Sequence, residues 1–170
     1  MFQIKYRFPT KLLTTLCLLA ALSTLACINT QAEELLIELE LPRLDVQPYH
    51  KPYVAVWLED ENRQHVATLA LWAKEDTWYK DLRQWWRKIG RKDPRAYDAV
   101  SGATRLPGEH KISWNNEALQ LEAGTYLLNF EASREEGGRS YHRKALKLGE
   151  KQTLTLPADG EFGSIQISLE

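Results

Sequence analysis

The feature that most constrains the fold of this chain is a set of short segments in which apolar residues fall at every second position. In "ELLIELELP" these positions run from Leu35 to Leu41, and a period of two predicts a β-strand with one buried face. The segments "HKISW", "GTYLLNFEAS", "RSYHRKALKL", "QTLTLP" and "GSIQISLE" are predicted strands as well, and Gly137-Gly138 predicts a hairpin turn between two of them. Repeated short strands with turn signals between them predict a mainly β protein, an antiparallel β-sandwich.

Two further segments, "PYVAVWLED" and "HVATLALWA", carry apolar residues on both sides of the predicted strand. In the first, Tyr53, Ala55 and Trp57 share one side, and the valines and leucine between them share the other. A strand of this kind is expected at the centre of its sheet, covered twice. The stretch "SWNNEALQLEAGTYLLNFEAS" resembles a pattern of Ig-like bacterial extracytoplasmic modules, so the expected class is an Ig-like sandwich.

One segment, "EDTWYKDLRQWWRKIGRKD", has apolar residues at helical spacing instead, namely Trp78, Leu82, Trp85 and Ile89. It predicts one amphipathic α-helix, over about residues 76–90, inserted between strands. Asp76 is expected to cap its start, and Gly90 is expected to end it in the left-handed conformation. Basic residues occupy the other face and the residues that follow: Lys80, Arg83, Arg87, Lys88, Arg91, Lys92 and Arg95. They have two interpretations, a solvated helix face or a positive field beside an anion site.

The N-terminal segment has the pattern of a secretory signal peptide. Basic "MFQIKYRFPTK" precedes the short apolar run "LLTTLCLLAALSTLAC", and cleavage is expected after Ala32. Residues 33–170 then remain as a single periplasmic domain. The alternative is a lipoprotein whose mature chain begins at a lipidated Cys27, which would be its own membrane anchor. Removing the three basic residues of the leader changes the net charge from −1 to −4, which gives no sign of nucleic-acid binding.

Two kinds of chemistry have weak support. The histidines are scattered without ligand spacing, and a metal site needs three or four convergent ligands, so a metal-binding accessory protein is a third possibility only. Ser101 in "AVSGA" lacks the first glycine of a G-x-S-x-G elbow, and no base for it is recognisable. Serine catalysis is therefore not expected.

The segment "DAVSGAT" is the most informative motif, with Asp98 and Ser101 leading to Gly102, Ala103 and Thr104. It resembles the flavinylation motif of extracytoplasmic FMN-carrier domains, in which an aspartate precedes a Ser/Thr-Gly-Ala-Ser/Thr tetrapeptide. The resemblance implies that a flavin transferase esterifies the Thr104 hydroxyl to the FMN phosphate. Small side chains before Thr104 would leave the backbone open to that enzyme, and Asp98 could position a metal or activate the hydroxyl in the complex.

Neighbouring residues supply candidate contacts for such a cofactor. Trp85, Trp86 or Tyr97 would shield the isoalloxazine or stack on it; adjacent helical residues point about 100° apart, so both tryptophans cannot face the core squarely. Four arginines are candidates for pairing with the phosphate or docking a partner, namely Arg87, Arg91, Arg95 and Arg105.

A second resemblance covers nearly the whole chain after the leader. Segments such as "YHKPYVAVWLED", "KDLRQWWRK", "DAVSGATRLPG" and "AGTYLLNFEASREEGG" resemble the bacterial periplasmic domain-of-unknown-function family 2271. That resemblance implies an extracytoplasmic location and association with flavin transferases and PepSY-type membrane proteins of transmembrane electron transfer. The hypothesis is a periplasmic redox carrier, or an accessory protein, rather than a stand-alone enzyme. The alternative is a cofactor-free Ig-like binding module, in which the motif is a turn and the basic face meets an acidic partner.

Overall fold

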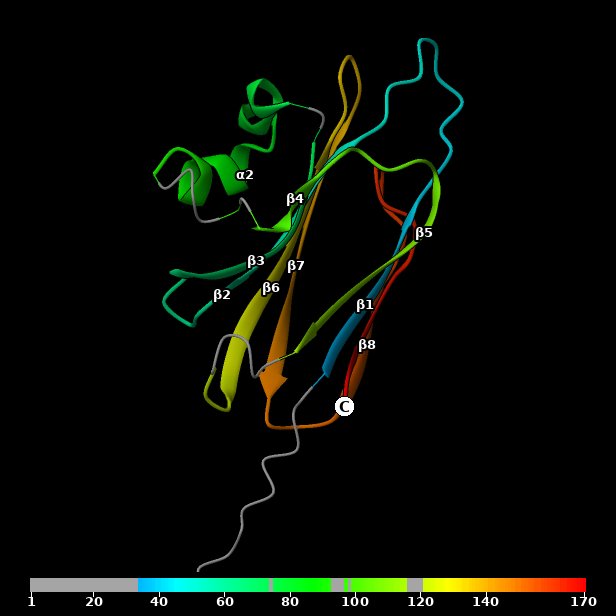
Figure 1. Ribbon diagram of the computed structural model, residues 1–170. Coiled ribbons are helices and arrows are strands. Elements are labelled where there is room, and N and C mark those ends of the chain that lie inside the picture. The colour runs from blue at the N-terminus through cyan, green and yellow to red at the C-terminus, as the bar shows by residue number, and fades with distance from the viewer. Residues whose placement is uncertain (1–33, 74, 93–96, 98, 116–120) are drawn as a thin grey trace, which may run out of the picture. The chain divides into compact units, whose positions relative to one another are not determined.

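Two sheets are built from strands that lie far apart in the sequence (Figure 1). The structure is a computed structural model that describes residues 34–73, 75–92, 97, 99–115 and 121–170. One sheet has four strands in the order β5-β1-β9-β8, and the other has five in the order β4-β3-β2-β6-β7. The bounds are β1 Glu34–Leu41, β2 Tyr53–Glu59, β3 His65–Trp72, β4 Ser101–Gly102, β5 Gly108–Asn115, β6 Gly124–Ser133, β7 Arg139–Leu148, β8 Gln152–Leu156 and β9 Ile165–Leu169.

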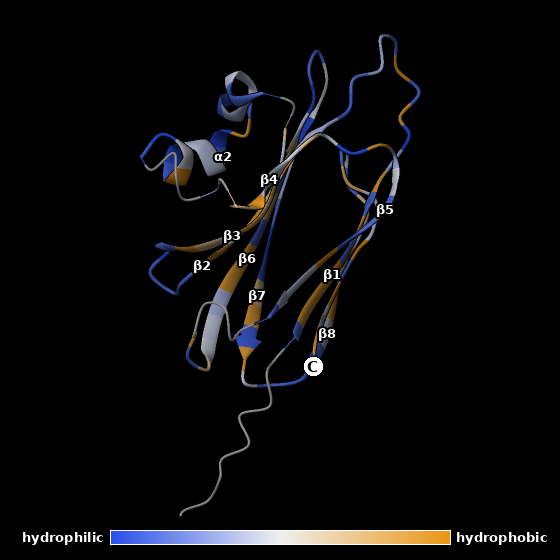
Figure 2. Ribbon diagram, viewed as in Figure 1, coloured by the Kyte–Doolittle hydropathy of each residue, from blue (hydrophilic) through white to orange (hydrophobic). Residues whose placement is uncertain are grey.

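The two sheets pack face to face through an apolar core, which confirms the predicted β-sandwich. On β1, the alternation seen in the sequence is the alternation of burial, with Leu35, Ile37, Leu39 and Leu41 all at most 1% exposed. They meet the inward residues of the other sheet, among them Val56 and Phe130. Hydrophobic residues lie along the strands of both sheets, whereas the loops are largely hydrophilic (Figure 2).

Strand β2 is central and buried along its whole length, as its two apolar faces predict. Its inward face joins the core between the sheets. Its outward face, with Tyr53, Ala55 and Trp57, joins a second apolar cluster that includes residues of the helical insert. The insert therefore covers the outer face of the five-stranded sheet, and the predicted double covering of β2 is confirmed.

The helical insert has the predicted bounds but is not one continuous α-helix. It consists of a 3-10 helix η1 (Asp76–Asp81), a single α-helical turn α2 (Arg83–Trp85) and a π-helical segment η2 (Trp86–Gly90). Leu82, with φ −77° and ψ 71°, breaks the helical backbone between the first two pieces. Helical spacing locates the insert but does not predict this break.

Both predicted end signals of the insert are wrong. Glu75 rather than Asp76 holds the position before the first helical residue, and its side chain makes no capping hydrogen bond. Gly90 is the last helical residue, but its φ is not positive. Its role is steric instead. A Cβ at Gly90 would lie 2.4 Å from Trp86 Cε3 and 2.7 Å from Trp85 Cζ3, closer than real Cβ contacts.

The buried carboxylate of Glu131 on β6 joins the insert to the sheet. It accepts hydrogen bonds from the backbone N–H groups of Gln84 at 3.0 Å and Trp85 at 2.9 Å. Arg139 Nη2 of β7 pairs with the same carboxylate at 2.6 Å. A charge taken out of water needs such partners, so the sheet supplies the cap that the insert's own sequence lacks.

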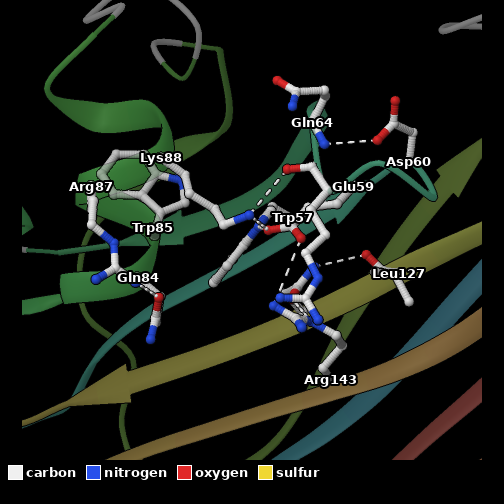
Figure 3. A network of polar contacts seen from close by, with 12 residues as sticks. Trp57, Glu59, Asp60, Gln64, Gln84, Trp85, Arg87, Lys88, Leu127 and Arg143 are labelled. Atoms are coloured by element: carbon white, nitrogen blue, oxygen red, sulfur yellow. Dashed lines mark hydrogen bonds and ion pairs between the residues drawn. The ribbon is translucent and has the colours of Figure 1, made fainter.

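A second buried carboxylate, Glu59 at the end of β2, makes another link (Figure 3). Its Oε1 accepts a hydrogen bond from Trp57 Nε1 at 2.8 Å and pairs with Lys88 Nζ of the insert at 3.0 Å. Arg143 Nη2 of β7 lies 3.8 Å from Oε2. Figure 3 shows Lys88 and Arg143 approaching Glu59 from the insert and from the sheet. These contacts hold the insert against one face of the sheet.

The described residues all belong to one compact unit of the chain. The signal peptide predicted for residues 1–32, Cys27 included, lies outside them. In the part of the chain that the structure describes, no helix has the length and apolar character needed to span a membrane.

Candidate functional site around Thr104

The motif "SGAT" begins as an edge strand of the five-stranded sheet. Its first two residues, Ser101 and Gly102, form β4, which pairs in parallel with Leu71 and Trp72 of β3. The backbone N–H of Ala73 donates to the Gly102 carbonyl oxygen at 2.9 Å. Thr104 therefore follows directly after an anchored strand, on a connection that crosses to β5 in the other sheet (Figure 1).

The backbone before Thr104 is open. A Cβ added to Gly102 would meet no atom within 4 Å, and the φ of this glycine is not positive. The fold therefore does not require a glycine at this position. Ala103 is exposed and Thr104 is partly exposed. A glycine that the fold does not require, beside a reachable hydroxyl, suits the approach of a modifying enzyme.

Thr104 also lines a pocket of about 490 Å³. Typical small-molecule pockets measure roughly 300–1,000 Å³. The walls come from the β1–β2 connection, the start of β2, the start of the helical insert and the β6–β7 turn. The lining residues besides Thr104 are Tyr49, His50, Lys51, Tyr53, Glu75, Trp78 and Glu135.

Two stacked aromatic rings form part of this pocket. The ring centroids of Tyr53 and Trp78 are 5.6 Å apart, and the planes of the rings differ by 16°. Tyr53 is buried, whereas Trp78 is partly buried and sits at the edge of the second apolar cluster. Both residues are among those that line the pocket with Thr104.

The polar groups of the pocket include two carboxylates and two basic side chains. Burial, followed by the nearby Glu135 carboxylate, raises the pKa of Tyr53 to about 12, so its hydroxyl keeps its proton and donates to Glu135. His50 Nδ1 lies 3.6 Å from Glu135 Oε2. Glu75 and Lys51 are exposed at the same pocket. Lys51 brings an ammonium group to the pocket that Thr104 lines.

The aromatic residues predicted from the sequence as partners of the flavin ring lie elsewhere. Trp85 has no exposed surface and packs edge-on against Tyr79, with ring centroids 5.7 Å apart, and against Tyr97, at 4.9 Å. Trp86 is partly buried against the same cluster. None of the three predicted ring partners, Trp85, Trp86 and Tyr97, is among the residues that line the Thr104 pocket.

The predicted arginines are not gathered at the pocket either. Arg105 is exposed, and its guanidinium lies 5.3 Å from the centroid of the Trp72 ring. Arg87 is exposed and donates to the Gln84 side chain, and Arg91, the first residue after the insert, is also exposed. Asp98 and Arg95 lie outside the described residues.

Sequence reasoning missed the aromatic wall of the pocket. Trp78 fits the helical core pattern and Tyr53 fits the strand pattern, so the sequence predicts a core position for both. Their shared position beside Thr104 arises because three separate segments meet at one end of the sandwich. No local spacing in the sequence signals that meeting.

Comparison with protein families gives a match over most of the chain. The profile of a family described as "Predicted periplasmic protein (DUF2271)" matches residues 34–164, which includes every strand but β9 and all of the pocket. No curated protein and no solved structure matches the chain. The match extends over well more than half of the sequence, and the chain therefore belongs to the DUF2271 family of predicted periplasmic proteins.

Proposed function

We propose that this protein is a periplasmic flavoprotein that carries FMN as a phosphoester on Thr104. It would pass electrons between a PepSY-type membrane reductase and a periplasmic acceptor. The observation that carries the proposal is the position of Thr104. The last hydroxyl of the "DAVSGAT" motif is partly exposed, follows an open backbone and lines a pocket of ligand size.

The covalent step requires a transferase and an activated donor. The Thr104 hydroxyl oxygen would attack the phosphorus of the FMN half of flavin adenine dinucleotide. The P–O bond to the AMP half breaks, AMP leaves, and the hydroxyl proton passes to a base in the transferase complex. The openness of Gly102 and Ala103 favours such an approach, because neither carries a side chain that would shield the threonine.

The residues around Thr104 fit the group. The attached flavin supplies one- and two-electron transfer, and the protein supplies attachment and environment. Lys51 lines the same pocket and can pair with the single negative charge of the phosphodiester. Arg105 is next in sequence, with its guanidinium held over Trp72 beside the motif. The exposed basic residues in and just after the helical insert do not line the pocket and remain for partner docking.

The test is co-expression with a flavin transferase, followed by a denaturing gel read for flavin fluorescence. We expect a fluorescent band and, on the peptide that contains Thr104, a mass increase of one FMN. Thr104→Val should abolish the label and Thr104→Ser should restore it, since only the hydroxyl is needed. Ser101→Ala should keep the label. A dark wild-type band, or a band that stays fluorescent in Thr104→Val, would remove this proposal.

A cofactor-free binding module is the second candidate, and the exposed basic residues of the insert favour it. Arg83, Arg87, Arg91 and Lys92 are all exposed in a chain whose formal net charge is −1. Such a cluster attracts acidic partners through a field that salt screens. For this candidate, replacing two of these arginines by glutamate should abolish partner capture, while Thr104→Val should leave it unchanged.

A further inference from the structure

The composition of the pocket beside Thr104 suits the ring of an FMN attached there better than it suits the phosphate. Three of its eight lining residues are Tyr49, Tyr53 and Trp78, and the other five carry polar or charged side chains. A flavin ring has flat faces that stack on aromatic side chains and polar edges that form hydrogen bonds, so it can use both kinds of group. The site that this composition describes is a place for a flat ring system.

We propose that the planar ring of the flavin attached at Thr104 lies against the wall formed by Tyr53 and Trp78, with Trp78 as its stacking residue. This inference rests on the proposed function and adds to it the location of the ring. It replaces Trp85, Trp86 and Tyr97 as ring partners.

Trp78 is suited to this role because its surroundings differ from those of Trp85. Trp85 is fully buried, with aromatic edges against it on two sides. Trp78 instead lies parallel to Tyr53 and contributes to the lining of the pocket. A large indole left partly exposed costs free energy unless something covers it. A flat ring stacked on this wall would cover it.

The charges of the pocket determine which end of the flavin lies where. Glu75 and Glu135 line it, and Glu135 already accepts a hydrogen bond from Tyr53. Carboxylates repel a phosphate but tolerate an uncharged ring with N–H donors. The phosphodiester therefore stays at Thr104, near the ammonium of Lys51, and the ring occupies the carboxylate-lined interior.

The tether makes this stacking contact intramolecular. A group bonded to a residue that already lines the pocket faces its wall at an effective concentration on the order of millimolar or higher. Aromatic side chains stack favourably on flat heterocycles. That stacking then acts without the entropic cost of bringing two free molecules together.

Flavin emission provides a direct readout. An excited flavin takes an electron from a stacked indole and returns it without emitting light, so a flavin stacked on tryptophan is dim. We therefore compare the emission of three flavin-loaded proteins: wild type, Trp78→Leu and Trp114→Leu. Each emission is divided by the emission after denaturation. Trp114 is the matched control because it is also partly buried, and it lies six positions from the start of β5, at the end remote from Thr104.

We expect dim emission from wild type and from Trp114→Leu, and a several-fold increase in Trp78→Leu. Iodide should quench the flavin of Trp78→Leu more strongly than the wild-type flavin, because the ring is no longer covered. Trp78→Phe, which keeps a flat ring, should give an intermediate emission and keeps the test valid if the leucine variant folds poorly.

The outcomes separate the two proposals. A wild-type protein with no flavin on Thr104 overturns the proposed function, and this inference with it. A labelled protein whose emission and iodide quenching are the same in wild type, Trp78→Leu and Trp78→Phe overturns the location of the ring alone.

Discussion

Gly90 and Gly102 are both small for a reason, but the reasons differ. At Gly90 a Cβ would collide with the rings of Trp85 and Trp86, whereas at Gly102 it would meet no atom within 4 Å. The packing of the insert therefore requires the first glycine. The second is free to serve recognition. This contrast supports a functional reading of the "SGAT" segment and gives it a test.

We predict that Gly102→Ala leaves the free energy of unfolding unchanged or raises it by up to about 1 kcal/mol, because alanine has less freedom to lose on folding. It should nevertheless slow flavin attachment at Thr104. Gly90→Ala should destabilise the fold by about 1–3 kcal/mol through overpacking. Denaturant unfolding and the time course of gel fluorescence measure the two effects.

The opposite pattern would count against this division of roles. If Gly102→Ala unfolds at lower denaturant and its labelling rate is normal, then Gly102 serves the fold. The stability of Gly90→Ala checks that the unfolding assay detects a true steric cost.

Tyr53 links the pocket to the pH dependence of stability. Burial raises its pKa from the ordinary 10.0 to about 12 in the folded chain. The unfolded chain loses this proton near pH 10. The contribution of the protonated Tyr53 hydroxyl to the free energy of unfolding is therefore complete below about pH 10, and it is lost as the pH rises to about 12. We predict that the loss of unfolding free energy over this interval is smaller in Tyr53→Phe than in wild type, measured by denaturant titration. Parallel curves for the two proteins would contradict the assignment.

At the scale of elements, the helical insert depends on the sheet beneath it. Its short pieces give few helical hydrogen bonds, and Glu131 of β6 accepts the N–H groups of Gln84 and Trp85 that the insert's own side chains leave unmet. Helices this short are not stable alone in water. The insert should therefore be the part of the molecule that opens first when this carboxylate is changed.

We predict that Glu131→Gln lowers the free energy of unfolding by about 2–4 kcal/mol, since it removes a buried charge from the Arg139 pair and weakens two backbone bonds. Hydrogen exchange followed by mass spectrometry should show that, relative to wild type, exchange accelerates more in residues 76–90 than in β1 or β9. Glu136 is an exposed carboxylate of the β6–β7 turn, and Glu136→Gln is the control. It should change neither the free energy of unfolding nor the exchange rates. Uniform acceleration across all strands would show that Glu131 supports the whole fold rather than the insert.

The insert also shows what sequence patterns can predict. The spacing from Trp78 to Ile89 located it correctly, because the same residues form its buried face. The break at Leu82 and the steric role of Gly90 depend on Glu131 and on the packing of two indoles. These are tertiary effects, which override local helix signals such as Asp76.

At the scale of the molecule, alternation predicted the sandwich because every second residue of β1 faces one core. The same alternation does not predict the order of the strands within each sheet. β1 pairs with β5 and β9, more than 65 residues away, and the two-residue β4 joins β3 in parallel. The motif identified Thr104, but the pocket around it depends on this long-range topology. Its aromatic wall could therefore be found only in the structure.

One buried ion pair ties the two sheets together near that pocket. Arg134 in the β6–β7 turn pairs with Glu161 in the β8–β9 connection at 2.9 Å, and both are less than 10% exposed. The N–H of Gly138 donates to the same carboxylate at 3.0 Å. The Arg134 guanidinium lies 6.0 Å from the centroid of the Tyr49 ring, which lines the Thr104 pocket. The pair therefore stabilises both the closure of the sandwich and one wall of the site.

We predict that Glu161→Gln and Arg134→Met each lower the free energy of unfolding by about 3–5 kcal/mol, because each leaves the partner's charge buried and unpaired. The double variant Arg134→Met/Glu161→Gln should lose clearly less than the sum of the two, since neither charge then remains. Denaturant unfolding measures all three, and Glu150→Gln, which breaks the exposed Lys147 pair, should cost under about 1 kcal/mol. Additive losses would mean that the two residues act separately and that their ion pair does not join the two sheets.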